Sequence, residues 1–170
     1  MKKTFDVLNE MVSDRAIENY AITGAIGAIF YIEPFATQDI NVLVVMPKAE
    51  GGLVAEMPGG RYLRGRGYSE MKGEAIVVES WPVQFIPVSD ALEEEAYLNA
   101  EVLPYEDTSV RVVLSEHLVA IMLKVGRPKD LARVQMFLSQ DAVERKSLLN
   151  IIRRHGLGDK WVAFQNKFPS

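Results

Sequence analysis

Three polar side chains have the types and the spacing of a nucleotide-binding site. Asp39 and Asn41 are separated by one residue at the start of an apolar, β-branched run, and Gln84 lies in a later apolar segment. Side chains at i and i+2 of a strand point to the same face, so Asp39 and Asn41 would share one face. Carboxylates in such positions can hold Mg²⁺ against the phosphates of a nucleoside triphosphate. Asp39 is therefore a candidate metal ligand, with Asn41 beside it on the same face.

A glycine-led segment precedes these residues. It begins with Gly24 and Ala25, directly after a short apolar strand, and predicts a helix that runs to Ile32 and is ended by Pro34. The free N–H groups of a helix N-terminus bind phosphate. Gly24 and Gly27 also have a simpler explanation, because two glycines one turn apart allow close helix packing. The glycine pair alone does not decide between these readings.

A basic segment with one acidic residue lies at the end of the helix that the sequence predicts for residues 115–126. It contains Lys124, Arg127, Lys129 and Asp130. Cations there could meet the phosphates of a nucleotide across a cleft. They could equally complement the dipole of a helix C-terminus and be followed by a solvated turn, with Asp130 paired to a cation. We expect Lys124 to line the cleft and Asp130 to brace a nearby cation.

The order of these motifs resembles the DNA polymerase beta-like nucleotidyltransferase superfamily over most of the chain. The most similar subgroup is the abortive-infection toxin-type nucleotidyltransferases, whose helical half carries a Lys, an Arg and a basic-Asp pair as residues 124–131 do here. Gly24 matches the glycine motif, and Thr37 with Asp39 matches the Thr-x-Asp-x-Asp motif. The resemblance implies that Gly24, Ala25 and Thr37, together with Lys124, Arg127 and Asp130, would contact the nucleotide.

The chain departs from this family at its metal ligands. Ala25 replaces the Ser or Gly of the glycine motif, Asn41 replaces the second Asp, and Gln84 lies near the place of the third carboxylate. Asp39 is then the one metal carboxylate that remains by position, which would weaken Mg²⁺ binding. Glu79 would be a substitute if its hairpin turned inward.

Two functions follow from the resemblance. The first is a divergent nucleotidyltransferase that binds a nucleoside triphosphate with Mg²⁺ and transfers a nucleotidyl group, with Asn41 and Gln84 assisting Asp39. The second is a descendant of this fold without catalysis, which would bind a nucleotide, RNA or a protein partner, for example in a toxin–antitoxin or phage-defence system. The missing carboxylates favour the second function, and the retained basic segment indicates an anion site in either case. The Arg- and Tyr-containing residues 59–68 could also grip a phosphate backbone, although a mobile loop explains their composition as well.

Apolar periodicity predicts an α+β fold, with a small mixed sheet of four or five strands, flanking helices and a C-terminal helical lobe. The expected strands are residues 20–23, 39–46, 74–79, 82–87 and 109–114. The expected helices are residues 4–19, 24–32, 89–100, 115–126, 128–138, 142–154 and 158–167. Residues 47–73 hold many glycines and are expected to be irregular.

Composition supports two regions of opposite charge. Residues 1–114 carry 9 Lys/Arg and 18 Asp/Glu, whereas residues 115–170 carry 10 Lys/Arg and 5 Asp/Glu. We expect a nucleotidyltransferase-like core at 1–114 and a helical lobe at 115–170, attracted to each other or, through the basic lobe, to an anion. The chain has no cysteine, which excludes disulfides and thiolate metal sites. No apolar run is long enough to span a bilayer, and a cytoplasmic location is expected.

Overall fold

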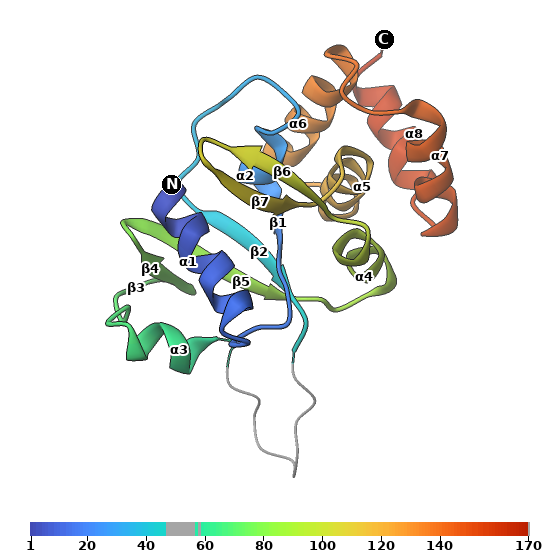
Figure 1. Cartoon of the computed structure of the whole chain (residues 1–170). Coiled ribbons are helices and arrows are strands. Elements are labelled where there is room, and N and C mark those ends of the chain that lie inside the picture. The colour runs from blue at the N-terminus through green and yellow to red at the C-terminus, as the bar shows by residue number, and fades with distance from the viewer. Residues whose placement is uncertain (47–56, 58, 170) are drawn as a thin grey trace.

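A mixed β-sheet forms the centre of the computed structural model (Figure 1), which describes residues 1–46, 57 and 59–169. In this part of the chain the sheet has seven strands in the order β3-β4-β5-β2-β1-β7-β6. The strands are β1 (Ala21–Thr23), β2 (Ile40–Val44), β3 (Met71–Lys72), β4 (Ala75–Val78), β5 (Trp81–Pro87), β6 (Glu101–Tyr105) and β7 (Thr108–Val112). The predicted α+β class is confirmed, and the sheet is larger than the expected four or five strands.

Strand β2 lies at the centre of the sheet, and most of its side chains are apolar on both faces. It runs antiparallel to β1 and parallel to β5. Ile40 and Val42 point into one hydrophobic core, whereas Leu43 belongs to the core on the other face. A strand covered on both sides needs such a nearly continuous apolar run, as the sequence predicts for this segment.

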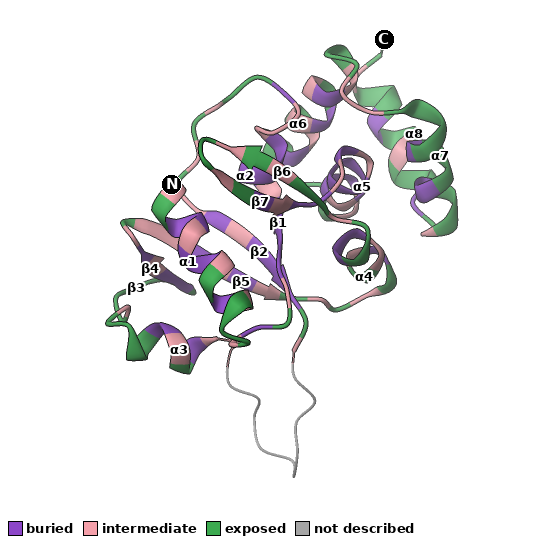
Figure 2. Ribbon diagram, in the orientation of Figure 1, coloured by how far each residue is buried: buried purple, intermediate pink, exposed green. Residues whose placement is uncertain are grey.

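Helices cover both faces of the sheet, and the buried residues lie along these contacts (Figure 2). On one face, α1 (Lys2–Ser13) contributes Phe5, Leu8 and Met11 to the core. The opposite face packs against α4 (Ala91–Leu98) and α5 (Ser115–Val125), and their core continues into the C-terminal helices. The remaining helices are α2 (Gly24–Ala28), α3 (Gly60–Gly65), α6 (Pro128–Ser139), α7 (Arg145–Arg154) and α8 (Gly158–Lys167).

Several predicted element boundaries are wrong for local reasons. Helix α2 has only five residues and ends well before Ile32, so its dipole is smaller than the predicted helix would have had. Helix α1 ends at Ser13, and Arg15 follows with a positive φ of 58°. The turn between β4 and β5 lies at Glu79 and Ser80, both with positive φ, rather than one residue later.

The expected irregular region and the expected strand set also need correction. Within the described residues of 47–73 the chain forms α3 and the short strand β3; the rest of that prediction falls on residues 47–56 and 58, outside the described residues. Strand β6 was not predicted, because it contains Pro104 and largely exposed side chains. It lies at the edge of the sheet and pairs only with β7 among the described strands, a position where proline is tolerated.

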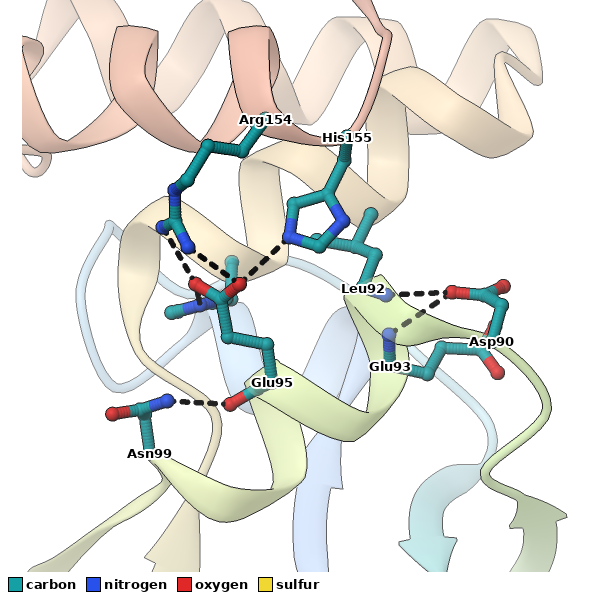
Figure 3. A network of polar contacts seen from close by, with 8 residues as sticks. Asp90, Leu92, Glu93, Glu95, Asn99, Arg154 and His155 are labelled. Carbon is teal, nitrogen blue, oxygen red and sulfur yellow. Dashed lines mark hydrogen bonds and ion pairs between the residues drawn. The ribbon is translucent and has the colours of Figure 1, made fainter.

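Helix α4 connects the sheet to the C-terminal helices through one carboxylate (Figure 3). Glu95 accepts hydrogen bonds from Arg154 at 2.9 and 2.7 Å, and it lies 2.7 Å from His155 and 3.0 Å from His117. Two of these partners belong to the end of α7 and one to α5. The interaction therefore joins three helices. Both histidines take part in this packing contact.

Among the described residues, no helix combines the length and the apolar composition needed to cross a membrane.

Candidate functional site

A cavity of about 350 Å³ lies between the ends of the central strands and the helices α5 and α6. Asp39, Asn41 and Gln84 all line it, as expected if they share one face of the sheet. Apolar side chains form a large part of the wall: Leu43, Ile86, Leu118, Ile121, Met122 and Val125. The remaining lining residues are Thr23, Gly24, Ala25, Glu93, Arg127, Lys129, Asp130 and Arg133.

Three of the lining residues form one row across three neighbouring strands. Thr23 on β1 is the register partner of Asn41 on β2, and Asn41 is the register partner of Gln84 on β5. Directly opposed side chains on one face of a sheet lie next to each other. We call these three residues the polar row. Its members are a hydroxyl and two amides, so the row itself carries no charge.

Gly24 follows the polar row directly and leaves room for it. Its φ of +62° favours glycine, and a Cβ at this position would come within 2.9 Å of the Asn41 amide nitrogen. A side chain here would therefore displace Asn41. The glycine has a geometric reason to be present, independent of whether the short helix α2 contacts a ligand.

The hydroxyl of Thr23 has no hydrogen-bond partner among the described residues, although Thr23 is only 5% exposed. A buried polar atom without a partner costs free energy, and the great majority of such atoms in native proteins are paired. Thr23 also lines the cavity. A bound ligand with an oxygen acceptor would satisfy this hydroxyl.

Asp39 immediately precedes β2 and lies between two hollows. It lines the main cavity, and it lines a second hollow of about 320 Å³ on the side of β3 and β4. Gln84 also borders both, and its amide donates to the carboxylate of Glu74 at 2.9 Å. This contact fixes the orientation of Gln84 and leaves its amide oxygen directed elsewhere.

Helix α6 places a basic cluster at the cavity. Asp130 is only 3% exposed and accepts hydrogen bonds from Arg127 at 2.6 Å and from Arg133 at 3.3 Å. Asp130 therefore braces two cations, in agreement with its expected part. Lys129 lines the same cavity and is exposed, and no ion-pair partner is found for it among the described residues. The start of α6 thus presents more positive than negative charge to the cavity.

Lys124 does not line the cavity, so this expectation is wrong. Its ammonium group forms ion pairs with Asp90 and with Glu93, the latter at 3.2 Å, and so links α5 to the start of α4. Burial works to lower the pKa of Lys124, but the hydrogen bonds to the two carboxylates outweigh it and raise that pKa. Sequence spacing placed Lys124 near the apolar face of α5, yet its partners come from a helix distant in sequence.

The carboxylates of the cavity do not fit a Mg²⁺ site. Glu93 is paired with Lys124, and Asp130 is paired with two arginines, which leaves Asp39 as the one lining carboxylate without a cation partner among the described residues. In the same part of the chain, no cluster of three or more His, Cys, Asp or Glu side chains is arranged to hold a metal. The neutral ligands of the polar row do not replace the missing charge.

Glu79 is not a substitute for the missing carboxylates. It accepts a hydrogen bond from the hydroxyl of Tyr68 at 2.6 Å, and it lines a different hollow beside α1. Of the segment 59–68, Arg66 is paired with Glu10 and lies over the ring of Tyr62. These contacts give the segment a place in the packing against α1.

Two of the predicted site residues, Thr37 and Lys124, do not line the cavity, and several residues that line it were not predicted. Thr37 is not among the residues that line it; its hydroxyl makes a long contact of 3.5 Å with the Asp39 carbonyl. Ala25 does line it. The polar and charged lining residues that were not predicted are Thr23, Glu93 and Arg133. The i, i+3 spacing of Asp130 and Arg133 was a usable signal, whereas nothing in the sequence reveals that Thr23 faces Asn41.

Comparisons with known proteins agree with this architecture at the level of the fold. No known protein family and no curated protein matches the chain. Among solved structures, the chain is similar to an antigenic nucleotidyltransferase-like protein from Paracoccidioides brasiliensis, with a TM-score of 0.66 and 13% sequence identity. The match covers 99% of this chain and 88% of the other. The chain therefore has a nucleotidyltransferase-like fold.

Proposed function

We propose that the chain binds a nucleotide in the cavity between the polar row and the start of α6. The observation that carries this proposal is the meeting, in one cavity, of an unpartnered buried hydroxyl at Thr23 with the basic cluster of Arg127, Lys129 and Arg133. A ligand that offers oxygen acceptors and negative charge satisfies both. The apolar wall suits the base of a nucleotide.

The residues of the cavity have distinct parts in this binding. Arg127 and Arg133 are oriented by the buried Asp130, so their guanidinium groups are fixed before a ligand arrives. Lys129 adds a charge that no described residue neutralises. The amides of Asn41 and Gln84 supply donors and acceptors at the end of the sheet.

Thermal stability tests this function. We expect ATP, GTP or CTP to raise the melting temperature. Part of this rise should persist in EDTA, because the positive charges that would bind the phosphates are side chains of the protein rather than metal ions. Lys129→Ala should reduce the rise. Lys146→Ala, a change of the same charge on the distant helix α7, should leave it unaltered. Equal losses in both variants, or no stabilisation by any nucleotide, would contradict the proposal.

Nucleotidyl transfer is the second candidate function. It is favoured by the position of Asp39, which lines the same cavity as Asn41 and Gln84 on the strand ends. We propose the toxin-type nucleotidyltransferases as the related subgroup, an RNA or protein as acceptor, and the cytoplasm as location, on the resemblance of residues 124–131 and the motif around Asp39. Incubation with labelled nucleoside triphosphates, Mg²⁺ or Mn²⁺ and total RNA would reveal transfer. Label in RNA that is lost in Asp39→Asn would establish it.

A further inference from the structure

We infer that the preferred ligand is a nucleoside monophosphate, whose phosphate is held directly by protein side chains and without a metal ion. This inference rests on the proposed function, because it concerns the same cavity. It follows from three features of the described residues: the neutral polar row, the charge balance of the lining, and the apolar wall.

In the polar row, the Thr23 hydroxyl and the Asn41 amide can donate hydrogen bonds to a ligand, whereas the amide nitrogen of Gln84 already donates to Glu74. Thr23, Asn41 and Gln84 are register partners on β1, β2 and β5. The Thr23 hydroxyl is buried and unpartnered. An amide and a hydroxyl can donate directly to phosphate oxygens. Two added carboxylates in these positions would repel the same phosphate, so the neutral row favours direct contact.

The charges of the lining limit how much negative charge a metal-free ligand can bring. Three acidic and three basic side chains line the cavity. Glu93 is paired with Lys124, which lies outside the lining, so the charges left are the single negative charge of Asp39 and those at the start of α6. There, Arg127, Lys129 and Arg133 oppose Asp130 alone, and the local positive surplus is close in size to the charge of one phosphate monoester, about −1.5 to −2 at neutral pH. Each further phosphate group adds negative charge that only a metal ion or solvent would neutralise.

The rest of the cavity suits a nucleoside. Ile121, Met122 and Val125 on α5 and Leu43 and Ile86 on the sheet form apolar walls around a space that a base can enter. Asp39 borders both hollows. A carboxylate without a cation partner accepts hydrogen bonds from sugar hydroxyls. Phosphate, sugar and base would thus each meet a complementary surface.

Calorimetric titration of the full chain with AMP, GMP, CMP and UMP in EDTA tests the inference. At least one monophosphate should bind, and it should bind at least about threefold more tightly than its own triphosphate. Addition of Mg²⁺ should change its affinity by less than about twofold. Tighter metal-free binding of the triphosphate would overturn the inference and leave nucleotide binding intact. Absence of binding by every mono- and triphosphate, with and without Mg²⁺, would overturn the proposed function itself.

A pair of threonine variants tests whether the row contacts the ligand. Thr23→Val preserves shape and removes an unpartnered hydroxyl, so it should leave the melting temperature equal or higher while weakening monophosphate binding about tenfold or more. Thr4 is buried as well, but its hydroxyl donates to the carbonyl of Val78 at 3.1 Å on the other face of the sheet. Thr4→Val should therefore lower the melting temperature and leave affinity within about twofold. Unchanged affinity in folded Thr23→Val would overturn the assignment of the row.

Discussion

Replacement of Glu95 by glutamine removes the charge that joins α4 to the C-terminal helices and keeps nearly the same shape. In the native protein Arg154 donates to both carboxylate oxygens, and His155 and His117 lie at 2.7 and 3.0 Å. A glutamine can keep one acceptor oxygen, but its NH₂ group faces a donor. We expect Glu95→Gln to loosen the attachment of α7 to α4.

The pKa of Glu95 gives the scale of this effect. Burial works to raise it, but hydrogen bonds from Arg154, His117 and His155 outweigh burial and lower the pKa from 4.5 to about 2. At about 1.4 kcal/mol for each pKa unit, the charged form gains roughly 3 kcal/mol. The side chain is 21% exposed, and solvent screening reduces the gain. We therefore expect a loss of about 2 kcal/mol, or about 4–8 °C in melting temperature for a chain of this size.

The dependence on pH has a defined sign. Because folding lowers the pKa of Glu95, its contribution is present in full above the unfolded value of 4.5 and is lost as the pH falls towards 2. Glutamine does not titrate. The difference in unfolding free energy between wild type and Glu95→Gln should therefore shrink as the pH falls from about 5 towards 2.

Urea unfolding followed by tryptophan fluorescence measures this difference. Trp81 lies on β5 and Trp161 on α8, so the emission reports on the sheet and on the C-terminal helices together. Glu94→Gln is the matched control, because Glu94 is an exposed neighbour on the same helix and should change stability by less than about 0.5 kcal/mol. Equal effects of the two variants, or a Glu95→Gln effect that grows as the pH falls below 4.5, would refute the reasoning.

Three further predictions concern the cavity. The double variant Asn41→Asp, Gln84→Asp adds two carboxylates beside Asp39 and should bind Mg²⁺ at least about tenfold more tightly than wild type in calorimetry; no gain in a folded double variant would mean that these three positions do not form a metal site. Lys124→Met should lower stability in urea unfolding by about 1 kcal/mol through the loss of its ion pairs, and should weaken nucleotide binding only because it leaves Glu93 without a cation at the cavity; the double variant Lys124→Met, Glu93→Gln should therefore bind as wild type does, and weak binding by the double variant would place the ammonium group at the ligand. Asp130→Asn should lower the free energy of unfolding by about 2 kcal/mol in urea and also weaken nucleotide binding, because Arg127 and Arg133 lose the buried carboxylate that orients them. Unchanged affinity would mean that Asp130 does not act on the nucleotide site.

The sequence alone determined many, though not all, of the local elements of this fold. The apolar run of 39–46 predicts a strand covered on both faces, and Ile40–Val44 is that strand. Pro128 in the first turn marks the start of α6, and Asp90 caps α4 with hydrogen bonds to the backbone of Leu92 and Glu93. These signals are local, because they depend on side-chain periodicity and on the backbone groups nearest to each residue.

Only the tertiary structure decided which residues share the cavity. The polar row joins Thr23, Asn41 and Gln84 from three strands, and its register depends on strand pairings between segments far apart in the chain. Lys124 shows the same limit, because its spacing on α5 indicates a cleft but its partners come from α4. Local pattern fixes the direction of a side chain relative to its own element. Which residues surround that side chain depends on strand pairing and helix packing between distant segments, and no single position of the sequence indicates these contacts.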